Sequence, residues 1–172
     1  MENTGTMPTD WSAWRPRERA NLCFIVRGDE VLLIHKKRGL GAGKINGPGG
    51  RLEPGETAAN AAVREVREEL CVTPLNPSLR GELHFQFADG YALHCSVFLA
   101  EGCEGEPAET DEAAPLWVRT GEIPFDKMWA DDRHWLPGLL EGRCFRAFFD
   151  FDGERMLAHR IFWAETLEEV EP

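Results

Sequence analysis

The sequence predicts a single α/β domain in which a mixed β-sheet carries a helix on each face. Three observations predict this fold. Several short apolar runs are bounded by turn signals, as consecutive β-strands are. Residues 57–70 have the apolar spacing of an amphipathic helix, and a second helix is expected over residues 134–140. The chain of 172 residues is long enough for one core, and no internal repeat indicates a second.

The expected strands follow one another along the chain, often in hairpin-like pairs. Gly-Asp or Asp-Gly dipeptides, which favour tight turns, separate the members of three pairs. A Gly-rich loop over residues 39–50 precedes the first helix, and an acidic loop covers residues 102–114. The expected strands are residues 20–26, 31–34, 79–88, 91–100, 116–118, 144–151 and 155–163.

The ends of the chain differ in composition from its centre. Residues 1–19 are polar and contain two prolines, so we expect an N-terminal extension of uncertain order. Trp11 and Trp14 could pack back onto the domain. We assign residues 20–166 to the domain and residues 167–172 to an acidic C-terminal tail.

Charge and cysteine content exclude several classes of protein. The formal net charge of −11 argues against a nucleic-acid polymer as partner, because such a surface needs a basic stripe. No apolar run reaches the length of a membrane span, and the N-terminus lacks the apolar core of a secretory signal. The five cysteines are odd in number and form no CxxC pair, which predicts free thiols in the cytoplasm and makes a zinc site unexpected.

The first helix carries three closely spaced glutamates. Its apolar positions recur at steps of four, three and four, the spacing of one buried stripe: Ala59, Val63, Val66 and Leu70. Glu65, Glu68 and Glu69 are then expected on the opposite face, where their mutual repulsion would be relieved by Mg²⁺ or Mn²⁺. Glutamates on an exposed helix face are commonly just solvated, so this spacing alone leaves both interpretations open.

A longer pattern favours the metal interpretation. Gly50 is followed six positions later by Glu56, and eight positions after that by the segment Arg-Glu-Val-Arg-Glu-Glu of residues 64–69. This fixed spacing resembles the Nudix box, the signature of hydrolases that act on a nucleoside diphosphate linked to another group. Cys71 stands where the box has a Gly that serves as left-handed C-cap, which should cost about 1 kcal/mol without touching an expected ligand.

The resemblance implies the α/β/α sandwich of Nudix hydrolases and hydrolysis that depends on Mg²⁺, with Mn²⁺ as a possible substitute. It also implies five metal ligands: the carbonyl of Gly49 and the carboxylates of Glu65, Glu68, Glu69 and Glu112. One of these glutamates should be the general base, and the choice among Glu65, Glu69 and Glu112 stays open.

Basic residues surround the expected metal site. The resemblance implies that Arg64 holds the box together by pairing with a glutamate, for which Glu56 is the candidate. Lys36 and Arg51 could reach phosphate oxygens or could simply be solvated.

Two further segments, residues 36–57 and 111–137, extend the resemblance to about residues 20–165. They are similar to the mammalian-type MutT homologues, a branch of the Nudix family that hydrolyses 8-oxo-dGTP. Leu40 stands where that branch has a Phe, which leaves the fit around the base open. The resemblance implies a substrate pocket with these residues: Asn21, Lys36, Leu40, Asn46, Phe85, Met128, Trp129, Asp131 and Asp132, with Trp135 beside them.

The two adjacent aspartates allow two interpretations. An Asp at a helix start is usually an N-cap. Alternatively, an ionised Asp131 or Asp132 accepts hydrogen bonds from a purine, while its neighbour, kept protonated by that charge, donates one. Trp129 would then stack on the base, and the amide of Asn46 would contact its edge.

The expected activity is hydrolysis of oxidised purine nucleoside triphosphates, such as 8-oxo-dGTP and 2-hydroxy-dATP, to monophosphate and pyrophosphate, which sanitises the nucleotide pool. Two alternatives stay open: a general nucleotide, ADP-ribose or dinucleoside polyphosphate pyrophosphatase, or a catalytically silent nucleotide-binding module. We expect a monomer that acts on a small nucleotide and binds neither a nucleic-acid polymer nor a membrane.

Overall fold

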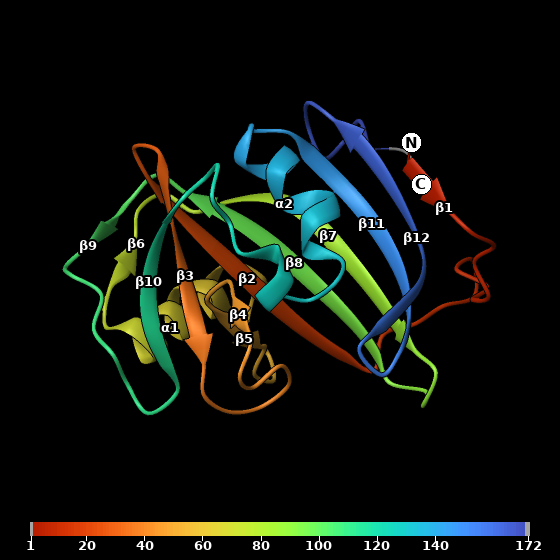
Figure 1. The fold of residues 1–172 in the computed structure, drawn as a ribbon, viewed down its shortest axis with the longest axis horizontal. Coiled ribbons are helices and arrows are strands. Elements are labelled where there is room, and N and C mark those ends of the chain that lie inside the picture. The colour runs from red at the N-terminus through yellow and green to blue at the C-terminus, as the bar shows by residue number, and fades with distance from the viewer. Residues whose placement is uncertain (1, 171–172) are drawn as a thin grey trace.

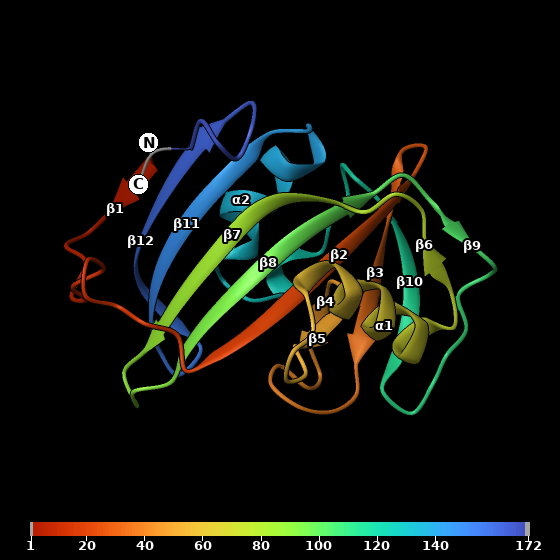
Figure 2. The ribbon, with the colours of Figure 1, turned by 180° about the vertical axis from the view of Figure 1, so that it is seen from behind.

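Side chains that alternate along the central strand divide the sheet into two buried faces. In the computed structural model, which describes residues 2–170, Cys23 and Ile25 of β2 (Glu18–Arg27) pack beneath helix α1 (Ala58–Leu70). Phe24, between them, joins the opposite apolar cluster with Trp135 of helix α2 (Asp132–Leu140). Figure 1 shows α2 in front of the sheet, and Figure 2 shows α1 in front of the other face. The predicted mixed sheet with a helix on each face is confirmed.

In the part of the chain that the structure describes, the main sheet has ten strands. Their order is β1, β12, β11, β7, β8, β2, β3 and β10, with β4 beside β3 and β5 beside β2. The β2–β8 and β7–β11 pairs are parallel, and the other pairs of this sheet are antiparallel. Besides β2, the strands of this sheet are β1 (Glu2–Thr4), β3 (Glu30–Lys36), β4 (Ile45–Asn46), β5 (Gly49–Arg51), β7 (Ser78–Phe87), β8 (Ala92–Ala100), β10 (Ala113–Arg119), β11 (Cys144–Asp152) and β12 (Arg155–Ala164).

The seven expected strands and both helices are present within a few residues of their predicted bounds. The strands that sequence reasoning missed are short: β1, β4, β5, and the separate pair β6 (Thr73–Pro74) and β9 (Cys103–Glu104). Segments of two or three residues are too short to show an alternating pattern. A 3₁₀ turn, Phe125–Lys127, leads towards α2. Within residues 2–170, no helix is long and apolar enough to cross a membrane.

Helix α1 begins and ends as its sequence predicts. The Thr57 hydroxyl accepts a hydrogen bond from the backbone N–H of Asn60 at 3.2 Å, which caps the N-terminus. Cys71 ends the helix with φ 61°, in the left-handed conformation that the box normally assigns to Gly.

Val66 and Leu70 of α1 are buried as predicted, but the predicted division into a buried stripe and an opposite glutamate face is wrong at Ala59 and Glu69. Ala59 is exposed, and Glu69 is buried next to Val66 and Leu70. The physical reason is that β5 packs against the side of the helix that carries Glu65 and Glu69, so this side faces protein and not solvent.

The chain ends are partly anchored on the domain. Strand β1 pairs with the sheet edge at β12, and the rings of Trp11 and Trp14 contact strands β11 and β7. At the other end Val170 is buried, and its carbonyl accepts a hydrogen bond from Arg146 at 3.3 Å. The domain limits of 20 and 166 stay a prediction. Residue 1 of the expected extension and residues 171–172 of the expected tail lie outside the described residues.

Candidate active site

Two glycines of β5 allow the backbone to lie close to both β2 and α1. A Cβ atom added to Gly50 would lie 2.4 Å from Cδ of Glu65, and one added to Gly49 would lie 2.0 Å from the carbonyl oxygen of Asn21. Neither position has room for a side chain. Strand β5 is therefore wedged between β2 and the glutamates of the helix.

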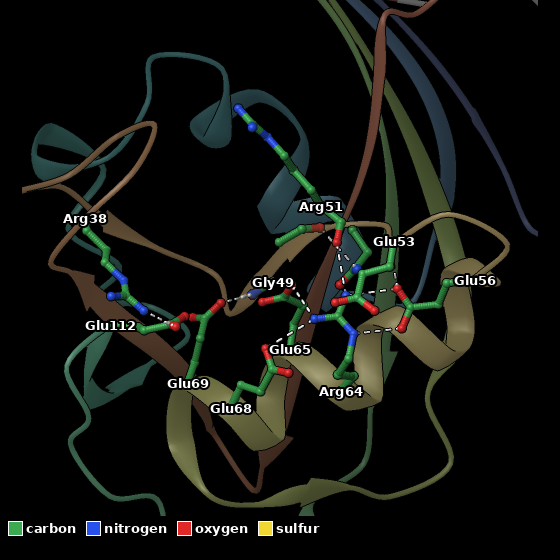
Figure 3. A network of polar contacts seen from close by, with 12 residues as sticks. Arg38, Gly49, Arg51, Glu53, Glu56, Arg64, Glu65, Glu68, Glu69 and Glu112 are labelled. Atoms are coloured by element: carbon green, nitrogen blue, oxygen red, sulfur yellow. Dashed lines mark hydrogen bonds and ion pairs between the residues drawn. The ribbon is translucent and has the colours of Figure 1, made fainter.

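Three of the predicted carboxylates come together beside β5. Glu65, Glu69 and Glu112 each place an oxygen within 4.8 Å of the others (Figure 3). Glu112 reaches the group from the loop just before β10, so residues far apart in sequence meet here. Glu69 Oε1 accepts a hydrogen bond from the backbone N–H of Gly49 at 3.2 Å, while its Oε2 is buried without a partner among the described residues.

Ion pairs neutralise only part of the negative charge of this group: Arg64 binds Glu65 at 2.8 Å and Arg38 binds Glu112, whereas Glu69 has no ion pair within the described residues. Burial raises the pKa of Glu69 to about 8; the Gly49 N–H and Lys36 oppose this, and Glu65 and Glu112 add to it. Burial also raises the pKa of Glu65, against the effect of the neighbouring Arg64. Closely spaced, all-oxygen donors with one orphaned oxygen fit a hard divalent cation such as Mg²⁺ or Mn²⁺.

Glu68 is not part of this group. Its side chain is 49% exposed and pairs with Arg64 Nη1 at 3.2 Å on the outer side of the helix. Gly49 contributes its N–H to Glu69, and the role of its carbonyl as a ligand stays a prediction. The difference arises because Glu65 and Glu69, one turn apart, point towards β5, whereas Glu68 lies on the neighbouring edge of the helix.

Arg64 joins the start of the box to the helix, as the resemblance implies. Its guanidinium binds both carboxylate oxygens of Glu56, at 2.8 and 2.9 Å, and one oxygen of Glu65 at 2.8 Å. It also donates to the carbonyl of Arg51 at 3.1 Å (Figure 3). The hydrogen bonds from Arg64 lower the pKa of Glu56 to about 2. One side chain thus fixes the turn, β5 and the metal-facing glutamate relative to one another.

A cavity of about 400 Å³ connects the carboxylates to an aromatic wall on the α2 face of the sheet. Most of the predicted substrate-binding residues line it. They are Asn21, Lys36, Leu40, Asn46, Phe85, Trp129, Asp131 and Asp132, together with Trp135 and Arg51. Met128 is not among the lining residues: it is 5% exposed and packs within the apolar core, and its role at the substrate site stays a prediction.

The two aspartates do not cap the helix with their side chains. Asp131 Oδ2 accepts a hydrogen bond from Trp135 Nε1 at 2.9 Å, and Asp132 Oδ2 is buried with no partner in residues 2–170. Burial raises the pKa of both carboxyls, and the charge of Asp131 raises the pKa of Asp132 further. Repulsion between two buried carboxylates favours keeping one proton in the pair, and the hydrogen bond from Trp135 favours the charged form of Asp131, so Asp132 is the favoured place for that proton.

Sequence reasoning missed much of the cavity wall. Rings of Phe87 and Phe151 contact Trp129 edge-to-face, at 6.3 and 5.8 Å between centroids. Alternation along β7, starting from Phe85, could have identified Phe87, but no local signal connects Phe151 to this site. The other lining residues that were missed are Ala20, Leu22, Arg38, Gly39, Gly47, Leu83, Tyr91, Leu93 and Cys95.

The model of the NUDIX domain matches residues 16–139, and this match together with the fold makes the chain a member of the Nudix family. It is a Nudix hydrolase, an enzyme class that acts on small nucleotides and generally needs a divalent metal ion. The predicted family and sandwich fold are confirmed.

Within the family the chain is similar to two vertebrate enzymes named oxidized purine nucleoside triphosphate hydrolase. It is 41% identical to that of Danio rerio, over 87% of this chain and 94% of the relative. It is 35% identical to that of Mus musculus, over 81% and 91%. Among solved structures, a MutT protein from Bacillus halodurans has a TM-score of 0.76 at 28% identity, covering 84% of this chain and 97% of the other.

Proposed function

We propose that the protein hydrolyses oxidised purine nucleoside triphosphates, of which 8-oxo-dGTP is the first candidate, to the monophosphate and pyrophosphate. The observation that carries this proposal is that one cavity contains both the glutamate group and the aspartate pair. The vertebrate relatives, which match most of the chain, carry names with this activity.

Glu65, Glu69 and Glu112 would hold the cation, for which we propose Mg²⁺ with Mn²⁺ as a substitute. When bound, the cation would offset the charge of the phosphates and make water a better nucleophile. Arg64 keeps Glu65 in place through its bond to that carboxylate. Lys36 lines the cavity, and its charge lowers the pKa of Glu69; this position supports a role in which Lys36 would bind a phosphate oxygen.

The aspartate pair would recognise the base. Ionised Asp131 accepts a hydrogen bond from a ring N–H or amino group, and protonated Asp132 donates one to a carbonyl oxygen. Trp129 would stack against the purine, with Asn46 at its edge. Oxidation of a purine changes its donors and acceptors, so a site with both a fixed donor and a fixed acceptor can distinguish the oxidised base.

The cavity and the carboxylate group are complete within one chain, so we propose that the protein acts as a monomer. All five cysteines are free thiols, which suits the cytoplasm.

The test is a comparison of kcat/KM for 8-oxo-dGTP, 2-hydroxy-dATP, O6-methyl-dGTP and dGTP with Mg²⁺. Phosphorus NMR of the products distinguishes pyrophosphate from single phosphate release. We expect pyrophosphate as product and a preference for an oxidised base over dGTP. Equal values for all four nucleotides would refute the sanitising role and leave a general nucleotide pyrophosphatase.

A further inference from the structure

Part of the N-terminal segment packs directly behind the aromatic wall of the cavity. Residues 9–14, which we name the strap, precede the start of the family match at residue 16. The chain runs from β1 at the sheet edge to the start of β2 (Figure 2). Within the strap, the rings of Trp11 and Trp14 contact each other at 5.4 Å between centroids.

The strap contacts the outward-facing residues of β7 and β11. The Thr9 hydroxyl donates a hydrogen bond to Asp150. The Trp11 ring lies edge-on to Phe148, at 5.1 Å between centroids. Trp14 lies edge-on to His84 at 5.4 Å, and its Nε1 donates to Gln86 Oε1 at 3.0 Å.

The same two strands carry the cavity wall on their other face. The parallel register pairs His84 with Phe148, Gln86 with Asp150 and Phe87 with Phe151. Side chains alternate between the two faces of a strand. Gln86 and Asp150, which the strap contacts, therefore point away from the cavity, while their chain neighbours Phe87 and Phe151 point into it. A shift of either strand would therefore move the aromatic wall.

Gln86 connects the strap to the rim of the cavity. While its Oε1 accepts from Trp14, its Nε2 donates to the carbonyls of Phe87 at 3.0 Å and Tyr91 at 3.2 Å. Phe87 and Tyr91 both line the cavity. A continuous set of hydrogen bonds thus joins the indole of the strap to the turn that closes the base end of the site.

We propose that Trp14 is a positioning residue: through Gln86 it fixes the Phe87–Tyr91 turn and the aromatic wall, and so sets the affinity for the base. The proposal rests on the proposed function for the identity of that base. Trp14 touches no substrate in this arrangement. Its effect is on the position of β7 and β11, and therefore on KM and base preference but not on bond cleavage.

The experiment compares Trp14→Phe with the wild type on whichever nucleotide the wild type hydrolyses best, with dGTP as the reference. Phe keeps most of the ring but removes the N–H donor. We expect KM to rise roughly fivefold, the equivalent of one net hydrogen bond, with kcat nearly unchanged and a smaller preference over dGTP. Ser12→Ala is the control, since Ser12 is exposed and, among the described residues, hydrogen-bonds only to Asp10 within the strap.

Hydrogen exchange supplies a readout that does not depend on the substrate. In Trp14→Phe the backbone amides of residues 86–91 should exchange faster, and in Ser12→Ala they should not. Lower thermal stability with unchanged KM, base preference and exchange would overturn the proposal. If Trp14→Phe does not fold, Gln86→Glu tests the same proposal, because it keeps an acceptor for Trp14 but removes the Nε2 donor to the carbonyls of Phe87 and Tyr91, and it should likewise raise KM and speed the exchange of residues 86–91. Failure of the wild type on oxidised nucleotides would count against the proposed function, while the exchange comparison would still decide the role of Trp14.

Discussion

Replacing each aspartate of the buried pair by asparagine tests which one carries the proton. In Asp131→Asn the charged acceptor for the base is lost. A hydrogen bond to a charged group contributes about 1.5–3 kcal/mol, which corresponds to a loss of roughly 10- to 150-fold in kcat/KM for 8-oxo-dGTP. In Asp132→Asn the amide still offers an N–H donor where the protonated carboxyl had an O–H, so the loss should be smaller.

The pH dependence of kcat/KM shows whether the activity depends on a proton held by Asp132. As pH rises, Asp132 loses its proton, the donor disappears and two charges repel, so wild-type kcat/KM for the oxidised nucleotide should fall on the alkaline side. Asp132→Asn has no proton to lose there and should keep its activity to higher pH. The assay is a pH profile of kcat/KM for 8-oxo-dGTP and dGTP with each protein.

Stability gives a second, independent measure. A carboxyl whose folded pKa is raised stabilises the protein below its unfolded pKa, and this contribution is lost as pH rises through the folded value. Asp132→Asn should therefore gain stability relative to the wild type as pH increases from about 4. If Asp132→Asn lost more activity than Asp131→Asn and its pH profile were unchanged, the assignment of the proton would be refuted.

Three more substitutions test other parts of the structure. Glu69→Gln should lower turnover roughly 100-fold or more and abolish the Mg²⁺ binding that calorimetry detects. Its circular dichroism spectrum should be unchanged, because the amide oxygen can still accept the hydrogen bond from the Gly49 N–H. Full activity would reject Glu69 as a ligand. Cys71→Gly should raise Tm by about 2–4 °C, because Gly adopts the left-handed conformation without the backbone strain of about 1 kcal/mol that Cys71 carries. Cys71→Ala keeps that strain and should not raise Tm, so equal Tm values for the two variants would contradict the capping argument. Met128→Ala should cost about 2–4 kcal/mol of unfolding free energy in urea and leave KM nearly unchanged, and a large rise in KM would return Met128 to the substrate site.

Local sequence patterns were enough to predict the sheet, both helices and the glutamate box. Turn dipeptides and alternation identify long strands, and Thr57 marks the start of α1, because these signals act between near neighbours in sequence. The burial of Glu69 could not be predicted in this way. It depends on β5 lying against α1, and that contact follows from the absence of side chains at Gly49 and Gly50.

The base pocket was only partly predictable for the same reason. The sequence brings Trp129, Asp131 and Asp132 within four positions of one another, so they could be recognised together. Phe151 comes to the cavity from β11 through the parallel pairing with β7, which no local pattern encodes. Met128, next to Trp129 in sequence, packs within the apolar core and does not line the cavity, and sequence proximity to Trp129 could not distinguish these two environments.

The residues that match the family, 16–139, cover less of the chain than the strands and helices of the fold do. The match ends at residue 139, before β11 and β12, and begins after both strap tryptophans. A gene trimmed to those limits would encode a protein without Phe151 and with the β7 edge of the sheet left open. Such an edge invites pairing between molecules, so we expect the shortened product to aggregate rather than to lose activity gradually.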